Sequence, residues 1–353
     1  MTLRQMTDHA GQWLRGSGPH SDIVISSRVR LARNIAGFPF VGKANRHQRH
    51  ELLERSRREI TNNRLADHVL WVDLPSSPTL DRQLLVERHL ISRQHAKADD
   101  DLPRAVAVAP DESFAIMVNE EDHLRIQVLR SGLLLDEAFD QANRIDDALE
   151  DRLDFAYSRR FGYLTACPTN VGTGIRVSVM LHLPALRLTG EIEKVRRAAR
   201  DMHLAVRGLF GEGSEALGDL YQISNQTTLG KAEQEIMADF QHAVVPQIIA
   251  YEQHARQALV AQRPAALDDK IFRAWAVLTH ARVISSEEVL SLLSHLRLGV
   301  NLERIETVDI RTINELFLLT QPAHLQKIAG REMDAAERRE ARATLLRQRL
   351  GGR

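Results

Sequence analysis

The sequence contains very little cysteine and very little lysine. Cys167 is the only cysteine among 353 residues, so the chain cannot form an internal disulfide or a zinc site built on cysteines. This favours a reducing, cytoplasmic compartment. Lysine supplies six of the 47 cationic residues and arginine the other 41. Such a bias is typical of a GC-rich genome, and also of sites that bind phosphate through the planar guanidinium.

Several common protein classes are excluded by features that the sequence lacks. Basic and acidic residues balance at 47 each, which argues against nucleic-acid binding through bulk charge. No apolar run approaches the roughly 18 residues that cross a membrane, and the N-terminal stretch lacks the apolar core of a signal peptide. GxxxxGK[ST], H-R-D and D-F-G motifs are also absent. A nucleotide enzyme with this sequence would therefore use arginines rather than a P-loop lysine.

Strand and helix patterns divide the chain into two parts. Apolar alternation or short apolar runs predict strands in residues 21–34, 104–110, 114–119, 123–130, 161–166 and 175–183, and two strands around a glycine-rich loop in 205–226. Helical periodicity is found in residues 46–66, 78–92, 133–154, 191–204, 231–260, 264–282, 285–298, 308–320 and 334–349. We therefore predict an α+β region in residues 1–255 and an all-helical domain in residues 256–353.

Five arginines lie at predicted strand ends or in loops: Arg28 and Arg30 in SSRVR, Arg125 after NEED, Arg176 after GTG, and Arg207 before GLFGEG. Arg28 and Arg30 are two residues apart, so both side chains face the same side of a strand. Converging arginines neutralise a polyphosphate, and nearby glycines let main-chain N–H groups approach an anion. Surface salt bridging is the alternative for each arginine taken alone.

The stretch NEED (119–122) places three carboxylates in a predicted hairpin turn. They are either a solvated turn, or one of them accepts a guanidinium or acts as a base. Glu212 and Glu215 offer a further carboxylate on the glycine-rich loop GEGSEALG. Two carboxylates on opposite walls could hold a planar cation between them.

Cys167 begins the stretch CPTNVGTG at the end of the predicted strand 161–166. A lone cysteine often serves as a small buried apolar residue. Beside arginines it could instead be a thiolate. No histidine stands close by in sequence to act as its base, so a thiolate that orients a cationic substrate fits as well as a covalent nucleophile.

Four blocks occur in one order along the chain: SSRVRLARN, VNEEDHLR, CPTNVGTGIR and YQISN. Together they resemble the motifs of the ATP:guanido phosphotransferases, the family of creatine and arginine kinases, over roughly residues 20–255. CPTNVGTG is the most specific of the four. The resemblance implies a catalytic domain built on an antiparallel sheet flanked by helices. It also implies transfer of the γ-phosphoryl group of ATP, with Mg²⁺, to a guanidinium nitrogen.

Site residues follow from the matching motifs. Glu121 would be the catalytic carboxylate, Cys167 would face the substrate guanidinium, and Glu212 would be the second carboxylate, with Glu215 as the alternative. His89 would lie at the base and ribose of ATP. The arginines Arg28, Arg30, Arg125, Arg176 and Arg207 would clamp the phosphates, and no residue is expected to bind a metal directly. The implied ATP site also includes Ser26, Ser27, Val29, Val177, Ser178, Val179, Met180, Gly208, Leu209, Phe210, Gly211 and Glu212.

Two departures from the phosphagen kinases stand out. The SSRVR block begins at Ser26, without the helical domain whose loop closes over a small substrate, and a helical region follows the catalytic blocks. This arrangement resembles the bacterial protein-arginine kinases of the Clp stress system. The resemblance implies protein substrates with exposed arginines, a homodimer, and a Clp ATPase, a stress-gene repressor and a zinc-finger activator as partners. It implies no direct nucleic-acid partner and no membrane partner.

The tail RREARA (338–343) is similar to the phosphoarginine-sensing motif R-D-x-x-R-A of that group. Arg338, Arg342 and Ala343 match, but Arg339 stands where the motif has aspartate, so the acid that would hold a guanidinium is missing. A solvated basic helix face is the alternative. Two other functions also remain open: a kinase of free arginine or a related small molecule, and a non-catalytic adaptor that binds phosphoarginine or a Clp ATPase.

Overall fold

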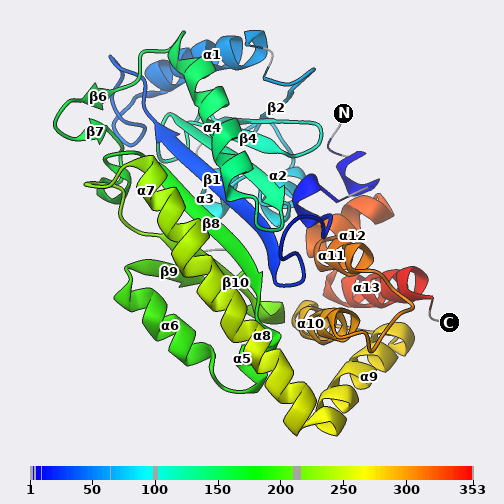
Figure 1. Cartoon of the computed structure of the whole chain (residues 1–353). Helices are drawn as coiled ribbons and strands as arrows, with labels where there is room; N and C mark the ends of the chain where they lie inside the picture. The colour runs from blue at the N-terminus through cyan, green and yellow to red at the C-terminus, as the bar shows by residue number, and fades with distance from the viewer. Residues whose placement is uncertain are drawn as a thin grey trace.

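The computed structural model describes residues 3, 5–8, 10–63, 65–97, 102–209 and 216–351. Across these residues, eight strands form one sheet in which all neighbouring strands are antiparallel (Figure 1). The strands, in their order across the sheet, are β2 (Leu70–Asp73), β3 (Ala105–Val108), β4 (Phe114–Val118), β5 (Leu124–Ser131), β1 (Val24–Arg33), β8 (Ile175–His182), β10 (Leu220–Asn225) and β9 (Leu204–Arg207). The predicted α+β class with an antiparallel sheet is confirmed.

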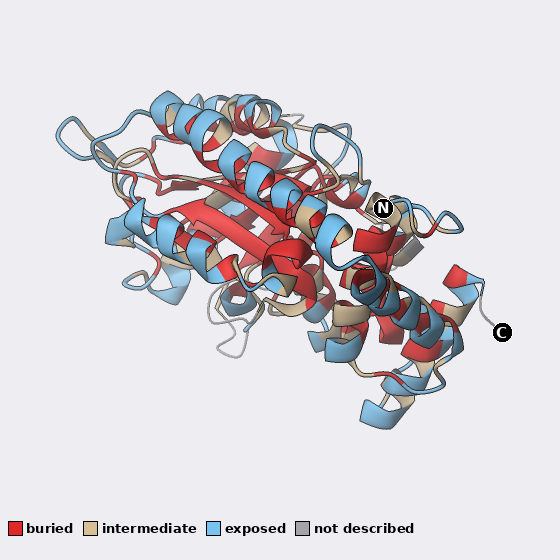
Figure 2. Cartoon of the chain, turned by 60° about the horizontal axis from the view of Figure 1, so that its bottom comes forward, coloured by how far each residue is buried: buried red, intermediate tan, exposed pale blue. Residues whose placement is uncertain are grey.

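Helices cover the sheet on both faces. In Figure 1, α4 (Leu135–Glu150) and α8 (Val245–Gln262) cross the face turned to the viewer, and α2 (Thr79–Glu87) lies behind the sheet. Figure 2 shows the strands buried and the outer helix faces exposed. The remaining helices of this region are α1 (Arg46–Asn62), α3 (Arg93–Ala96), α5 (Pro184–Leu188), α6 (Ile192–Asp201) and α7 (Glu233–Ala238).

The two faces of the sheet differ in chemistry because side chains alternate along each strand. Val29, Leu31 and Val177 are fully buried in the core that α4 covers. Arg28 and Arg30 lie between these residues on β1 and therefore project from the opposite face. That second face carries the apolar cluster beneath α2 at one side and the arginines at its centre.

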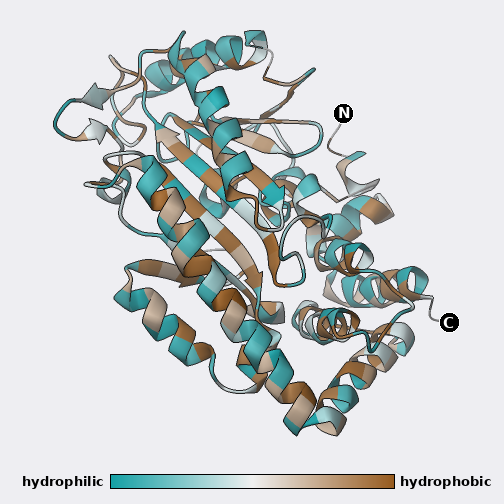
Figure 3. Cartoon of the chain, viewed as in Figure 1, coloured by the Kyte–Doolittle hydropathy of each residue, from teal (hydrophilic) through white to brown (hydrophobic). Residues whose placement is uncertain are grey.

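Among the described residues beyond α8 the regular elements are all helices, as predicted, and they gather at one end of the sheet (Figure 1). Figure 3 shows both hydrophilic and hydrophobic residues on these helices. They are α9 (Pro264–His280), α10 (Ser286–Asn301), α11 (Ile310–Leu319), α12 (Pro322–Ala329) and α13 (Ala335–Leu350). Residue 255, the predicted end of the catalytic region, lies inside α8, so this helix is shared by both parts.

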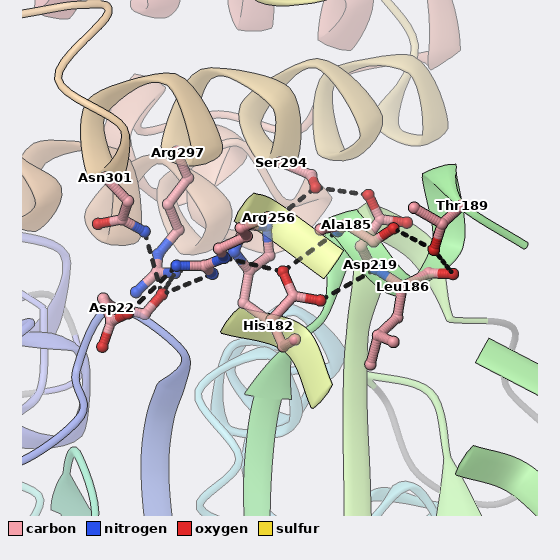
Figure 4. A network of polar contacts seen from close by, with 11 residues as sticks. Asp22, His182, Ala185, Leu186, Thr189, Asp219, Arg256, Ser294, Arg297 and Asn301 are labelled. Atoms are coloured by element: carbon pink, nitrogen blue, oxygen red, sulfur yellow. Dashed lines mark hydrogen bonds and ion pairs between the residues drawn. The ribbon is translucent and has the colours of Figure 1, made fainter. Parts of the chain in front are cut away.

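A buried polar network attaches the helical region to the end of the sheet (Figure 4). Arg297 on α10 donates hydrogen bonds to the carbonyls of Ser21 and Asp22 and to His182 Nδ1. His182 Nε2 then lies 2.9 Å from Ser294 Oγ, which donates to Asp219. Because every member is paired, the network joins the two parts without leaving a buried polar group unsatisfied.

Several predicted elements differ from the structure. The strand predicted for 161–166 is wrong in extent: β7 (Gly162–Tyr163) pairs only with β6 (Tyr157–Ser158), outside the main sheet. The helix predicted for 78–92 ends at Glu87, because His89 adopts a positive φ of 58° and turns the chain. The helix predicted for 231–260 contains a π-helical turn, η5 (Asp239–Val244), next to Pro246, which has no N–H for the regular ladder.

Five helices and strands were not predicted: β2, α3, β6, α5 and α12. Each is only two to eight residues long. Segments of this length are too short to show a periodicity of their own, so their structure depends on the neighbours against which they pack.

Candidate active site

Register across the sheet brings the five arginines together. Arg30 on β1 stands opposite Arg176 on β8, and Arg28 follows one pleat along the same face. Arg125 is the second residue of β5, and Arg207 is the last residue of β9. All five line one cavity of about 570 Å³. The predicted convergence of the arginines is therefore present in the structure.

The arginines repel one another. Burial, followed by the charges of Arg125, Arg176 and Arg207, lowers the pKa of Arg28 to about 10. Burial, followed by the charges of Arg28 and the other three arginines, lowers the pKa of Arg30 well below its usual value. The Nε of Arg30 is buried without a hydrogen-bond partner among the described residues. Arg28 is held by Ser178 Oγ and Gln222 Oε1, which are neutral. Such a cluster stabilises a polyanion that binds there.

The carboxylates of the NEED turn differ in their contacts and in their exposure. Glu120 accepts from Ser92 Oγ at 2.6 Å and pairs with Arg125 at 2.9 Å. Burial alone would raise the pKa of Glu120, but the charge of Arg125 and these hydrogen bonds lower it. Glu121 also contacts Arg125, at 3.0 Å, but its side chain remains 43% exposed. Burial raises the pKa of Glu121 against the opposing effect of Arg125, which suits a proton acceptor.

Asp122 connects this turn to the cysteine segment. It is fully buried, and its Oδ1 accepts from Asn34 Nδ2 and from the main-chain N–H of Ala166, both at 2.7 Å. Ala166 directly precedes Cys167. One buried carboxylate thus fixes the positions of Glu121 and Cys167 relative to each other.

Cys167 lies on the wall of the same cavity as Glu121 and Arg176. Its Sγ is 3.1 Å from Thr169 Oγ1, and the short 3-10 turn η3 (Pro168–Asn170) follows. Gly172 has φ +114°, and a Cβ there would lie 2.4 Å from the carbonyl oxygen of Thr228. Only glycine fits this position without moving the loop.

Arg33 supports the loop from behind and was not predicted. Its side chain is fully buried, donates to Asp146 Oδ2 and to the Thr173 carbonyl, and lies 3.6 Å from the centre of the Tyr163 ring. The arginine therefore links α4, β7 and the glycine turn. Its place in SSRVRLARN gave no hint of this, because the alternation along β1 predicts only which face a side chain occupies.

His89 lies in the cavity wall at the turn that ends α2. Its ring contacts Trp13 edge-on at 5.2 Å. Burial, followed by the charges of Arg28 and Arg93, lowers the pKa of His89 to about 3, so the ring is neutral. Gln127 Nε2 donates to the His89 carbonyl and fixes the turn. A neutral ring here can contact a nucleotide base or ribose without adding charge.

Other residues predicted to contact ATP are divided between the two faces of the sheet. Ser26 and Met180 line a small cavity that adjoins His89 and Arg28, and Leu209 lines an apolar one beside Trp13. Val29, Val177 and Val179 face the core, and Ser27 Oγ bonds the Gly132 carbonyl and the Leu134 N–H. These four side chains do not reach the cavity. Gly208 is buried at the end of β9, whereas Phe210, Gly211, Glu212 and Glu215 lie outside the described residues.

Sequence reasoning missed several polar residues of the cavity wall, including Ser92, Gln127, Asn170 and Gln222. A usable signal existed for Gln127, which follows Arg125 by two residues on the same strand and therefore shares its face. Ser92 and Gln222 come from segments that reach the cavity only through the fold.

The RREARA segment lies on α13, in the helical region. Arg342 is 2% exposed and donates to the carbonyls of Thr320 and Ile284 and to Ser286 Oγ. Ala343 is buried, Arg338 donates to the Met333 carbonyl, and Arg339 is exposed. Arg342 thus ties α13 to its neighbours, and a role in sensing phosphoarginine stays a prediction.

Comparison with known proteins agrees with this site. The family described as ATP:guanido phosphotransferase, C-terminal catalytic domain, matches residues 52–255. The chain belongs to the ATP:guanido phosphotransferase family. Residues 264–352 match the family described as protein-arginine kinase McsB C-terminal domain.

Relatives named protein-arginine kinase support the same placement. One from Symbiobacterium thermophilum is 50% identical over 96% of this chain and 96% of its own length. Another, from Halothermothrix orenii, is 45% identical over 99% of both chains. This ATP:guanido phosphotransferase is thus similar along its whole length to protein-arginine kinases.

Solved structures of other guanidino kinases share the fold. A duplicated taurocyamine kinase from Schistosoma mansoni aligns with 69% of this chain and 34% of its own at a TM-score of 0.61 and 26% identity. A lombricine kinase aligns with 71% of this chain and 72% of its own at a TM-score of 0.57 and 27% identity. Within the described residues, no helix of this phosphotransferase is long and apolar enough to cross a membrane.

Proposed function

We propose that this kinase transfers the γ-phosphoryl group of ATP to the guanidinium of arginine side chains in proteins. One observation carries the proposal: five arginines share a single cavity with Glu121 and Cys167. The arginines suit the triphosphate, and the carboxylate and the thiol suit a guanidinium. The protein-arginine kinase domain that residues 264–352 match, and the names of the relatives, support a protein as the acceptor.

In the proposed reaction a guanidinium nitrogen of the substrate attacks the γ-phosphorus as the bond to the ADP oxygen breaks. Glu121 takes the proton that the nitrogen loses, and its raised pKa favours this role. The arginines disperse the charge of the phosphates in the transition state. Cys167 faces the substrate cation, and Glu212, or Glu215, supplies the second carboxylate.

Mg²⁺ would enter as the complex with ATP. The described residues contain no group of three metal-binding side chains, so the triphosphate and water would provide most of its ligands. Glu120 and Glu121 are the carboxylates in the cavity wall that could approach it. Bound there, the ion would add positive charge where the leaving phosphate develops negative charge.

Further parts of the proposal have other grounds. The single cysteine supports a cytoplasmic location, and the pattern of strands and helices supports the division into residues 1–255 and 256–353. A homodimer and activation by phosphoarginine rest on the family resemblance. A Clp ATPase, a stress-gene repressor and a zinc-finger activator are the proposed partners, with marking of substrates for Clp-type proteolysis as the outcome.

The test is to incubate the protein with Mg·ATP and casein, an unstructured acceptor, and with free arginine in parallel. Mass spectrometry without acid would locate the phosphate, because P–N bonds are acid-labile. Phosphoarginine on casein that disappears with Glu121→Gln is the expected result. Phosphate on free arginine only would show a small-molecule kinase. ATP binding without transfer to either acceptor would favour the adaptor function.

A further inference from the structure

A second cavity, of about 490 Å³, opens where the helical region meets the catalytic sheet. Its walls come from α2, from α3 and from the start of α12. The lining residues are Thr79, Arg82, Gln83, Val86, Glu87, Arg93, Ala96, Lys97, Gln321 and Pro322. We call it the α3–α12 groove.

The groove borders the reaction cavity. Val86, Arg93 and Lys97 line both spaces. Helix α3 is also connected to the catalytic turn, because Ser92, its N-cap residue, donates to Glu120. A polypeptide whose arginine reaches Glu121 can therefore place a neighbouring residue in the groove.

The groove is cationic. Among the described residues its lining contains Arg82, Arg93 and Lys97 and one carboxylate, Glu87. That carboxylate is already engaged, since it accepts from the main-chain N–H groups of Ala323 and His324 and lies 2.7 Å from His324 Nδ1. The negative charge of Glu87 is thus directed at the start of α12.

Lys97 is the cation best placed to meet a ligand. Its side chain is exposed, and its Nζ forms no hydrogen bond or ion pair among the described residues. Arg82, in contrast, donates to the carbonyls of Leu74 and Ser77. It contributes positive charge to the groove, but some of its N–H groups are already engaged.

We propose that the α3–α12 groove binds an aspartate or glutamate side chain of the substrate polypeptide, a few residues from the arginine that is phosphorylated. This inference rests on the proposed function and names a preference within it. The five arginines of the reaction cavity face the site proposed for ATP, so Lys97 is the cation of the groove that can meet the acceptor chain. A free arginine has no residue to place there, which makes the groove a feature for protein substrates.

The test uses pairs of peptides that contain one arginine in a neutral sequence. Each pair differs by aspartate or asparagine at one position, from two to six residues on either side of the arginine. We would measure kcat/KM for phosphorylation and, by fluorescence anisotropy with Mg·ADP bound, the Kd of each peptide. The proteins are the wild type, Lys97→Gln, and Lys270→Gln as a matched control on the exposed face of α9.

At one offset or more, the aspartate peptide should have a kcat/KM about two- to fivefold above that of its asparagine partner, the range of an exposed ion pair. The gain should lie in KM, because the contact binds ground state and transition state equally. It should disappear in Lys97→Gln and persist in Lys270→Gln. Because Lys97 also lines the reaction cavity, the quantity compared is the ratio of kcat/KM for the aspartate peptide to that for its asparagine partner, measured within each protein.

Equal rates and Kd values for aspartate and asparagine at every offset would overturn the proposal, as would a preference that survives Lys97→Gln. The binding measurement separates it from the proposed function. Tighter binding of aspartate peptides by a protein that phosphorylates none of them would support the groove and refute the kinase activity on proteins. Equal phosphorylation of aspartate and asparagine peptides would support the kinase activity on proteins and refute the role of the groove.

Discussion

The placement of the Arg30 side chain suits the binding of a ligand and does not stabilise the fold. Its Nε is buried without a hydrogen-bond partner among the described residues, and its charged neighbours in the cavity are other arginines. Burying an unpaired charge costs stability. An anion bound in the cavity would supply the partner that the Arg30 guanidinium lacks.

Arg30→Met should therefore weaken ATP binding while leaving the unliganded protein at least as stable. We expect the Kd for ATP to rise about 10- to 100-fold, the size of a lost hydrogen bond to a charged group. Calorimetry gives the Kd, and urea unfolding gives the free energy of unfolding. Arg144→Met, at an exposed arginine on α4, is the control. Unchanged ATP affinity with reduced stability would show that Arg30 is structural.

Glu121 is the residue on which the chemistry depends. Glu121→Gln should lower kcat about 10²- to 10⁴-fold, the usual contribution of a general base, with little change in the Kd for ATP. Because burial raises the pKa of Glu121, the wild-type rate should fall as the pH drops through that pKa, where the carboxylate becomes protonated. The variant should lose this acid limb. Glu54→Gln, an exposed carboxylate on α1, should behave as wild type.

At the scale of an element, the CPTNVGTG loop is a rigid support and not a flexible flap. Thr228 Oγ1 lies within hydrogen-bond distance of the Thr169 and Val171 carbonyls, and Arg33 holds Thr173. The carbonyl of Gly172 is also close to Gly162, where an added Cβ would lie 2.3 Å from it. Cys167 is thereby fixed from two sides.

Gly172→Ala should disturb this loop. The added Cβ would press on the Thr228 carbonyl at a φ that alanine avoids, so we expect kcat/KM to fall about tenfold or more and stability to fall by about 1–3 kcal/mol. Gly190→Ala is a matched control, since Gly190 also has a positive φ (+77°) but an added Cβ there would meet no atom within 4 Å. In Gly190→Ala the stability should change but kcat/KM should not. Full activity of Gly172→Ala would mean that the loop adapts.

At the scale of the whole molecule, the network in Figure 4 joins the sheet to the helical region, and we expect it to couple their unfolding. Arg297 is fully buried, and burial followed by the charge of Arg256 lowers its pKa to about 9. Its guanidinium binds two carbonyls of the segment before β1 and one histidine at the end of β8.

Arg297→Met should cost about 3–5 kcal/mol, because the acceptors that it leaves are buried. We expect urea unfolding, followed by tryptophan fluorescence and circular dichroism, to separate into two transitions. Arg273→Met removes an exposed arginine on α9 that pairs with Asp269 one turn away, and should change stability by less than about 0.5 kcal/mol. A single unshifted transition in Arg297→Met would contradict the role of the network.

Buried histidines should make the whole fold sensitive to acid. Burial lowers the pKa of His95 and of His123 to about 4, below the roughly 6.5 of an unfolded chain. Between these values the unfolded chain binds more protons, so stability is complete above pH 6.5 and declines towards pH 4, by up to about 1.4 kcal/mol per pH unit for each histidine.

Urea unfolding at several pH values measures this slope. His123→Asn should reduce it by about one proton in the interval between pH 6.5 and 4. His47→Asn, at an exposed position on α1, should leave the slope unchanged. An equal slope in His123→Asn would show that other groups cause the acid sensitivity.

The chemistry that this protein can perform, and most of its long helices and strands, can be predicted from the amino-acid sequence. Alternation along SSRVR placed Arg28 and Arg30 on one face, and the order of the motifs identified the family. Both signals can be recognised in the sequence because each depends on a few adjacent residues. The five arginines, Glu121 and Cys167 do share one cavity.

Tertiary structure alone decided the rest. Arg33, Asp122 and Arg297 became supports because their partners come from distant segments, and no local pattern records such a pairing. The short elements β2, α5 and α12 follow the same rule, since packing and not periodicity forms them. The groove between α3 and α12 likewise exists only because the helical region folds back onto α2, which brings residues more than two hundred positions apart to one surface.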